Sequence, residues 1–380
     1  MSDLSQEEIL RYSRHLILPD VGLEGQQKLK QSSVLLIGSG GLGAPIALYL
    51  AAAGIGHIGV VDYDSVEDSN LQRQIIHDTR GIGRRKVESA RSRMADLNPF
   101  IQVDAIDEVF TSENAMEIAN GYDILVDGTD NFPTRYLLND LAVLTHRPFI
   151  YGSIFRFEGQ VSVFDARSGP CYRCLFPEPP PAGSVPTCAE GGVFGVLPGT
   201  VGSIQATEVL KILLGIGEPL IGRLLLYDAL DMSMQTVRLR KNPDCLVCGE
   251  HPQIQHLVDY EQFCGVPTKG DYHVQGIEEI EPREAARRLE QDSSVIFLDV
   301  RDPVELQVSR LPGAMILPAG QVPMHLGDLG RSREWVVFCR TGQRSARVVK
   351  AMQAAGYRAV NLKGGINAWA EQIDPKLLRY

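Results

Sequence analysis

One stretch near the start of the chain, residues 34–64, most constrains the fold. It opens with the apolar run Val34–Ile37, continues through the glycine turn Gly38-Ser-Gly-Gly-Leu-Gly43, and then enters the alanine-rich run Ala44–Ala53. This order predicts a buried parallel strand, a tight turn and a helix. The glycines suit such a turn because they permit a sharp reversal, a close approach of the backbone to a phosphate, and close packing of the helix on the strand.

A second apolar run, Ile58–Val61, predicts the next strand, and it ends in Asp62. An acidic residue about 20 residues after such a glycine turn can accept hydrogen bonds from the hydroxyls of a ribose. The helix that starts at the turn would present unpaired N–H groups and the positive end of its dipole to a phosphate. The stretch therefore predicts a nucleotide site, and it leaves open whether the nucleotide is NAD, FAD or ATP.

Apolar runs and helical segments alternate through the first part of the chain, with helices expected at Lys86–Leu97 and Thr111–Asn120. That alternation predicts an open, largely parallel sheet. After a polar linker the pattern restarts, with a helix at Ile280–Glu290 and a buried strand at Val295–Val300. A chain of 380 residues, 44% of them hydrophobic, is long enough for two such domains with separate cores.

Charge and hydropathy exclude some classes of protein. The net charge of −10 and the lack of a lysine- or arginine-rich run argue against binding to nucleic acid. The first residues are polar and charged, so no signal peptide is expected. The most apolar long region, Val193–Leu214, contains Pro198, Glu208 and Lys211, which argues against a membrane span. The expected compartment is the cytoplasm, where thiols stay reduced.

Four of the seven cysteines form two Cys-x-x-Cys pairs, Cys171/Cys174 and Cys245/Cys248. In a reducing compartment, two such pairs in turn-rich sequences indicate one tetrahedral zinc site with four thiolate ligands, brought together by the fold. Redox-active pairs and incidental buried thiols are the alternatives. The lone Cys264 falls in the expected linker and is interpreted as an incidental thiol.

Charged residues follow the glycine turn and a later apolar run. Arg73 and Lys86 come soon after Asp62, and Asp130 comes soon after Ile124–Val126. Cations close to a nucleotide site offset the charge of a triphosphate, which favours ATP. Because the carboxyl ends of parallel strands face the ligand crevice, Asp130 is a candidate Mg²⁺ ligand or phosphate organiser. A solvated loop for the cations, and an Asx turn or helix cap for Asp130, are the alternatives.

The proline-rich segment 176–186 predicts an irregular crossover loop. This loop delivers Cys188 next to a pair of glycines, Gly191 and Gly192. A thiol on a mobile, glycine-containing loop suits the approach to a bulky substrate, and a buried structural thiol is an equal alternative.

Cys339 follows an apolar strand, Trp335–Phe338, and heads a loop that curls into a predicted helix. The N–H groups of such a loop, the helix dipole, and the cations Arg340 and Arg344 would stabilise an anion on the sulfur. Sulfurtransferases hold a persulfide in this way, and cysteine phosphatases hold a phosphate ester. The phosphatase alternative expects a histidine before the cysteine and a longer loop before the arginine, whereas a phenylalanine precedes Cys339.

Several motifs together carry a resemblance to known families. Residues 1–250 resemble the MoeB/ThiF adenylyltransferases, bacterial relatives of ubiquitin-activating enzymes, through RYSRHLILPDVG, GSGGLG, DYDSVEDSNLQRQ, GRRKVESA, DGTDN, PCYRC and CLVCG. After a linker at 251–272, residues 273–380 resemble a rhodanese domain through LDVRDPVE, CRTGQRS and GGINAW. The resemblance implies an α/β fold: a Rossmann-like, doubly wound, mostly parallel sheet with a four-cysteine zinc site, followed by an α/β rhodanese domain.

The resemblance also implies roles for the matching positions. ATP and Mg²⁺ would be bound by Gly41, Asp62, Ser69, Asn70, Leu71, Gln72, Arg73, Lys86, Asp130 and Asn131. Arg14 would reach a nucleotide phosphate across a homodimer interface, Cys188 would form an acyl intermediate, and Cys339 would carry the persulfide. Zn²⁺ would be held away from the chemistry by Cys171, Cys174, Cys245 and Cys248.

The implied function is ATP-dependent adenylation of the C-terminal Gly-Gly carboxylate of a small ubiquitin-like sulfur carrier, followed by sulfur transfer from the persulfide to give a thiocarboxylate. The implied partners are that carrier and an upstream sulfur donor such as a cysteine desulfurase. The alternatives are an NAD-dependent oxidoreductase with structural zinc, and a non-catalytic scaffold that holds a carrier and a donor.

Overall fold

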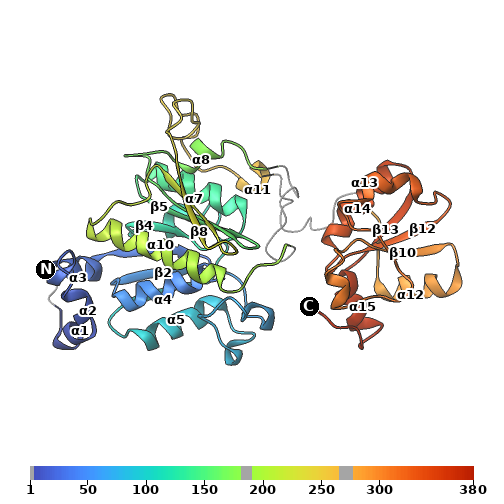
Figure 1. The fold of residues 1–380 in the computed structure, drawn as a ribbon, viewed down its shortest axis with the longest axis horizontal. Helices are drawn as coiled ribbons and strands as arrows, with labels where there is room; N and C mark the ends of the chain where they lie inside the picture. Colours follow the sequence, from blue (N-terminus) through green and yellow to red (C-terminus); the bar gives the residue numbers. More distant parts are fainter. Residues whose placement is uncertain (1–3, 181–190, 265–276) are drawn as a thin grey trace. The chain divides into compact units, whose positions relative to one another are not determined.

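The computed structural model describes residues 4–180, 191–264 and 277–380. The chain divides into two compact units, Met1–Val266 and Pro267–Tyr380, each with its own sheet and core (Figure 1). Within the described ranges, no helix combines the length and the apolar character needed to cross a membrane.

The first unit is built on an eight-stranded sheet with the order β3-β2-β1-β4-β5-β6-β7-β8. The strands from β3 to β5 in this order are parallel, and the sheet continues through antiparallel pairs to β8. The register places Ile37 beside both Val61 and Asp127, so the carboxyl ends of three neighbouring parallel strands lie together at one edge of the sheet. The strands are β1 Ser33–Ile37, β2 His57–Val61, β3 Gln102–Ile106, β4 Ile124–Asp127, β5 Phe149–Phe155, β6 Glu158–Phe164, β7 Arg223–Asp228 and β8 Ser233–Arg238.

Helices cover both faces of this sheet (Figure 1). One face packs through an aliphatic core against α3 (Gly22–Gln31), α4 (Gly43–Ala53), α5 (Lys86–Leu97) and α10 (Leu197–Leu214). The other face packs through a core rich in aromatic rings against α6 (Ala115–Ile118), α7 (Phe132–Leu144), α8 (Tyr172–Leu175) and α11 (Tyr260–Phe263). The chain begins with α1 (Gln6–Arg11), which has a capping box, and α2 (Ser13–Leu16). The short helices η1 (Asp68–Asn70) and η2 (Thr79–Gly81) follow β2.

The glycine turn between β1 and α4 has the expected close packing. Gly38 has a φ of 90°, in the left-handed region that favours glycine. A Cβ on Gly43 would lie 1.9 Å from the carbonyl oxygen of Gly38, so a side chain there would push α4 away from the end of β1. The strand, turn, helix and strand predicted for residues 34–64 are all confirmed.

The second unit has a five-stranded, fully parallel sheet with the order β11-β10-β12-β13-β9. Its strands are β9 Glu279–Ile280, β10 Val295–Asp299, β11 Met315–Ile316, β12 Glu334–Phe338 and β13 Arg358–Leu362. One face packs against α12 (Pro282–Gln291) and α15 (Gly365–Gln372), and the other against α13 (Val322–His325) and α14 (Gln343–Ala354). The short helices are η3 (Glu305–Gln307) and η4 (Leu326–Asp328).

Two expected helices differ from the observed ones. In place of Thr111–Asn120, only the four residues of α6 are helical, because the Asn114 side chain accepts the backbone N–H of Thr111 and closes a turn before the helix. In place of Ile280–Glu290, the helix begins at Pro282. Ile280 belongs to β9, which pairs with β13 and extends the sheet by one strand.

Cys264 is a core residue of the first unit, and the interpretation as an incidental linker thiol is wrong. It is buried among aromatic side chains, and burial raises the pKa of its thiol to about 11. The neighbouring Tyr260 donates its hydroxyl to Asp140 on α7 at 2.8 Å, and the same carboxylate pairs with the buried Arg173 at 2.8 Å. These contacts fix the segment that ends at Cys264 to the first unit.

Candidate active site and metal centre

A cavity of about 300 Å³ lies at the carboxyl edge of the parallel strands in the first unit. It is lined by the ends of β1 and β2 at Ile37 and Val61, by the glycine turn, and by Gly128 just after β4. The strand order reverses between β1 and β4, which is the place where open α/β sheets bind ligands. The cavity therefore lies where the glycine turn predicts a nucleotide.

Most of the residues expected to bind ATP line this cavity. They are Gly41, Asp62, Asn70, Arg73, Lys86, Asp130 and Asn131. The expected residues Ser69, Leu71 and Gln72 belong to the same segment as Asn70 and Arg73 but do not line it. The backbone carbonyl of Ser69 instead accepts a hydrogen bond from Arg73 Nη1 at 3.1 Å, which helps to orient the guanidinium.

Asp62 connects the end of β2 to the glycine turn. Its Oδ2 accepts hydrogen bonds from the backbone N–H of Ser39 at 2.9 Å and from the Ser39 hydroxyl at 3.0 Å. Its Oδ1 accepts the backbone N–H of Asp64 at 3.0 Å. The carboxylate is thus held in a fixed orientation while it lines the cavity, and a bound ribose would meet a rigid acceptor.

Lys86 is the first residue of α5 and is only 6% exposed. Its ammonium group lies 2.9 Å from Asp64 Oδ2, and both residues line the cavity. A buried lysine that faces a cavity is not part of a solvated loop, so this alternative is excluded for Lys86. The arrangement can place a positive charge next to an anionic ligand.

Asp130 and Asn131 follow β4 and have different local roles. Asn131 is the N-cap of α7, since its Oδ1 accepts the backbone N–H of Thr134 at 2.9 Å. Asp130 is exposed at the cavity and makes no side-chain hydrogen bond or ion pair with any residue that the structure describes. Its carboxylate is therefore available to a ligand or a cation.

A buried ion pair supports the loop that carries Asp130. Arg135 Nε donates to Asp127 Oδ2 at 3.0 Å, and Asp127 Oδ1 accepts the backbone N–H of Thr129 at 2.9 Å. Burial alone would lower the pKa of Arg135, but the adjacent Asp127 carboxylate outweighs burial and holds that pKa above its ordinary value. The pair fixes residues 128–131 between β4 and α7.

Gln74 is a cavity residue that the sequence analysis missed. It lies one residue after Arg73, is 4% exposed and lines the cavity. Its buried Oε1 has no hydrogen-bond partner among the residues with described positions. The sequence signal was weak because a glutamine in a short loop is usually a surface residue.

Arg14 does not reach the cavity of its own chain. It is an exposed residue of α2 and is absent from the cavity lining. Nearby apolar residues of the same region are also exposed, including Leu10 at 78% and Ile17 at 70%.

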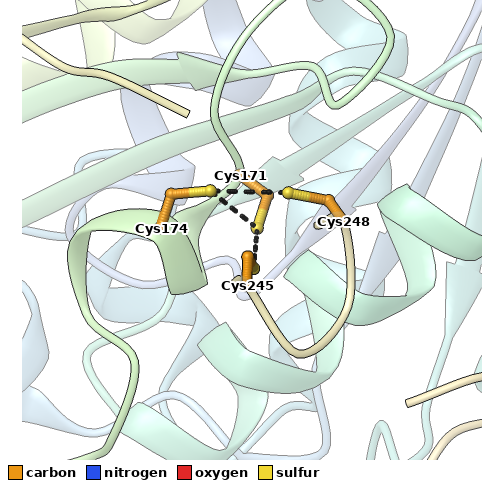
Figure 2. A group of neighbouring side chains, drawn as sticks. All are labelled: Cys171, Cys174, Cys245 and Cys248. Atoms are coloured by element: carbon orange, nitrogen blue, oxygen red, sulfur yellow. Dashed lines mark hydrogen bonds between the residues drawn. The ribbon is translucent and has the colours of Figure 1, made fainter. Parts of the chain in front are cut away.

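The four paired cysteines come together at α8, whose N-cap is Cys171 and which contains Cys174, although 70 residues separate the two pairs (Figure 2). Their sulfur atoms lie within 4.8 Å of one another, with separations of 3.8 Å for Cys171–Cys174, 3.5 Å for Cys171–Cys245 and 3.4 Å for Cys174–Cys248. Four thiolates at Zn–S distances of about 2.3 Å around a tetrahedral ion are separated by about 3.8 Å. The donor set and its spacing therefore fit Zn²⁺.

Replacing Cys245 with alanine is expected to remove bound zinc and to lower the free energy of unfolding by at least about 3 kcal/mol, because metal affinity at such a site is folding free energy. Metal content by plasma mass spectrometry and thermal unfolding measure the two effects. Cys264→Ala is the matched control, since it removes a buried thiol of the same unit outside the cluster. A Cys245→Ala protein that keeps one zinc per chain would contradict the assignment.

The expected acyl-forming residue, Cys188, lies outside the described residues, so its place relative to the cavity is not given. In the second unit, Cys339 follows β12 directly and is 1% exposed. Its Sγ accepts the backbone N–H of Gly342 at 3.2 Å and the hydroxyl of Ser345 at 3.5 Å. Gly342 has a φ of 93° and is the N-cap of α14. The loop therefore curls around the sulfur as expected.

The two arginines of the Cys339 loop have specific partners. Arg344 donates through both terminal nitrogens to Glu305, at 2.7 and 2.6 Å, so part of its charge is already matched by a carboxylate. Arg340 lies over the ring of Tyr380. The sequence predicts both arginines as cations for the sulfur, but it gives no signal for their partners Glu305 and Tyr380, which are distant from the loop in sequence.

Comparisons with known proteins match both units. The model of the ThiF family matches residues 12–247, and the model of the rhodanese-like domain matches residues 281–372. MoeZ of Mycobacterium tuberculosis, a probable adenylyltransferase/sulfurtransferase, is 49% identical over 100% of this chain and 97% of its own length. MOCS3 of Sus scrofa, an adenylyltransferase and sulfurtransferase, is 41% identical over 99% of this chain and 89% of its own length.

Two further matches each cover about two thirds of the chain. A sulfur carrier protein adenylyltransferase of Thermus thermophilus is 55% identical over 69% of this chain and 98% of its own length. The crystal structure of E. coli MccB with succinimide has a TM-score of 0.56 at 23% identity, over 63% of this chain and 74% of its own, and shows a shared fold. The chain therefore belongs to the ThiF family, carries a rhodanese-like domain in addition, and matches over its full length enzymes named adenylyltransferase/sulfurtransferase.

Proposed function

We propose that the chain adenylates the C-terminal Gly-Gly carboxylate of a small ubiquitin-like sulfur carrier with ATP and then converts it to a thiocarboxylate. In this proposal the unit Met1–Val266, which includes the α11 segment that the sequence predicts as linker, carries out adenylation, and the unit Pro267–Tyr380 carries out sulfur transfer. The proposal rests on the presence of two sites in one chain. The first unit has a cation-lined cavity at the end of β1, and the second unit has Cys339, whose sulfur accepts hydrogen bonds from its loop. The names of the full-length relatives agree with both steps.

The first step activates an unreactive carboxylate. The carrier carboxylate attacks the α-phosphorus of ATP, the bond to the β-phosphate oxygen breaks, and pyrophosphate leaves. The product is an acyl-adenylate, a mixed anhydride whose AMP is a good leaving group. Arg73 and Lys86 face the same cavity and offset the negative charge that builds up on the phosphates.

Two metal ions complete the proposal. Asp130, whose carboxylate lines the cavity without a partner among the described residues, would hold Mg²⁺, which would supply charge neutralisation for the triphosphate. The four paired cysteines would hold Zn²⁺, which stabilises the fold. Gln74 Oε1, a buried acceptor without a described partner, would accept a hydrogen bond from the bound nucleotide.

The second step transfers sulfur. The terminal sulfur of a persulfide on Cys339 attacks the acyl carbon, AMP leaves, and an acyl disulfide joins the carrier to Cys339. A thiolate then attacks the Cys339 sulfur, which breaks the S–S bond and releases the thiocarboxylate. Cys188 would either supply that thiolate, leaving a disulfide that a cellular thiol reduces, or accept the acyl group before the persulfide attacks.

The proposal includes three partners. The carrier is the substrate of both steps, and an upstream sulfur donor such as a cysteine desulfurase loads Cys339. A second copy of the chain would form a homodimer through the exposed apolar residues around α1 and α2, which brings Arg14 to the neighbouring cavity. A monomer in sedimentation at working concentration would contradict the dimer.

The test uses the full chain, a small ubiquitin-like protein ending in Gly-Gly, ATP and a persulfide donor. Mass spectrometry of the carrier is expected to show sulfur in place of one C-terminal oxygen, dependent on ATP. Tight binding of NAD without pyrophosphate exchange would indicate the oxidoreductase alternative. Binding of the carrier and donor without turnover would indicate a scaffold.

A further inference from the structure

The chain segment that follows α15 returns to the loop that carries Cys339. Tyr380, in this segment, lies with its ring 5.7 Å from the guanidinium of Arg340, within the range of a cation–π contact. Its backbone oxygen accepts a hydrogen bond from Asn367 Nδ2 at 3.0 Å. The backbone N–H of Asn367 in turn donates to the carbonyl of Arg340 at 3.2 Å. The ring of Tyr380 therefore contacts the Cys339 loop, and its backbone oxygen is bound to α15 beside this loop.

The hydroxyl of Tyr380 joins two charged groups. It accepts a hydrogen bond from Arg301 Nη1 at 2.9 Å and donates one to Glu305 Oε1 at 3.1 Å. Glu305 Oε1 also accepts Arg344 Nη2 at 2.6 Å. Arg301 is fully buried, and its Nη2 is held by Asp299 at 2.6 Å. One hydroxyl thus connects a buried ion pair to the ion pair next to Cys339.

We propose that Tyr380 is a positioning residue for sulfur transfer at Cys339, an inference that rests on the proposed sulfurtransferase function. The hydroxyl fixes the Glu305 carboxylate, and Glu305 fixes Arg344 in the first turn of α14 beside the sulfur. The ring fixes Arg340, the residue directly after Cys339. The segment after α15 therefore sets where the two loop cations lie when an anion forms on the sulfur.

The charge states of these groups agree with this arrangement. Burial raises the pKa of Tyr380 to about 12, so its hydroxyl remains a donor at neutral pH. Burial alone would raise the pKa of Glu305, but hydrogen bonds from Arg344 hold it below its ordinary value. Burial alone would lower the pKa of Arg344, but the Glu305 carboxylate has the opposite effect and holds that pKa above its ordinary value. The nearby Cys339 sulfur raises it further. Asp302, 3.7 Å from Arg344, is a further acid facing this cation.

The first test measures alkylation of Cys339 by iodoacetamide as a function of pH, in the full chain and in Tyr380→Phe. The phenylalanine keeps the ring under Arg340 and removes only the hydroxyl. A less firmly held Arg344 stabilises the thiolate less, so the alkylation profile is expected to shift to higher pH. The rate at pH 7 should fall by about 3- to 10-fold, the range for the loss of one hydrogen bond of ordinary strength that acts on the sulfur only through Glu305 and Arg344.

The second test separates the hydroxyl from the ring by steady-state kinetics. Thiosulfate gives its outer sulfur to the Cys339 thiolate and releases sulfite, and cyanide then removes that sulfur as thiocyanate. Tyr380→Phe is expected to lower kcat about 3- to 10-fold with little change in KM for thiosulfate. Tyr380→Ala, which also frees Arg340, is expected to raise KM in addition, because Arg340 no longer keeps a fixed position for the incoming anion.

Tyr357→Phe is the matched control. Tyr357 belongs to the same unit, donates its hydroxyl to the carbonyl of Leu326, and has Arg331 over its ring at 5.3 Å. Wild-type alkylation and kinetics in Tyr380→Phe, or an equal loss in Tyr357→Phe, would overturn the proposal. If the wild-type chain transfers no sulfur at all, the proposed function fails, and the alkylation profiles still decide the role of Tyr380.

Discussion

Replacing Asp130 with alanine is expected to lower carrier-dependent exchange of pyrophosphate into ATP by at least about 100-fold, the loss typical of one preorganised electrostatic group in a phosphoryl-type transition state. Asp130 follows β4 at the edge where β1 and β2 also end, and it lines the cavity with no described side-chain partner. A carboxylate that lines the cavity without a partner among the described residues has little structural purpose. Its loss should therefore affect the reaction much more than the fold.

The measurement is isotope exchange between pyrophosphate and ATP in the presence of a Gly-Gly carrier. Asp68→Ala is the matched control, because Asp68 is an exposed acid of η1 that does not line the cavity. Thermal unfolding should give nearly the same midpoint for both variants and the wild type. Exchange at close to the wild-type rate in Asp130→Ala would remove Asp130 from the role assigned to it.

Local sequence signals predicted the frame of the nucleotide cavity. The glycine turn and Asp62 are close in sequence and are linked in the structure through the hydrogen bonds of Ser39. The strand ends that carry Asp62 and Asp130 meet because parallel strands share a direction. Such features follow from backbone geometry, so a single sequence is enough to predict them.

Other features of the sites depend on tertiary packing and were missed. Glu305 and Arg344 are 39 residues apart, and Tyr380 is 75 residues beyond Glu305, so no local pattern connects them. Gln74 gains its importance only because the loop after η1 turns it toward the glycine turn. The polar sequence around Cys264 predicts a linker, whereas α11 packs on α7 through Tyr260.

Replacing Cys339 with alanine is expected to abolish thiocarboxylate formation, with a loss of at least about 100-fold, and to leave pyrophosphate exchange within about twofold of the wild-type rate. The chain separates into two compact units, and the cavity and Cys339 belong to different ones. Removing the sulfur therefore leaves every cavity residue in place. The carrier should then accumulate as its adenylate or be returned by hydrolysis.

Cys264→Ala is the control that distinguishes a reactive buried thiol from an inert one. Both cysteines are nearly inaccessible, but Cys339 Sγ accepts hydrogen bonds from a loop N–H and a hydroxyl, whereas Cys264 lies in an aromatic core that raises its pKa. The two thiols therefore differ in the hydrogen-bond donors around the sulfur and not in burial. Sulfur transfer should therefore survive Cys264→Ala with a modest loss of stability. If Cys339→Ala still forms the thiocarboxylate at the wild-type rate, the sulfur reaches the carrier by a route that does not use the second unit.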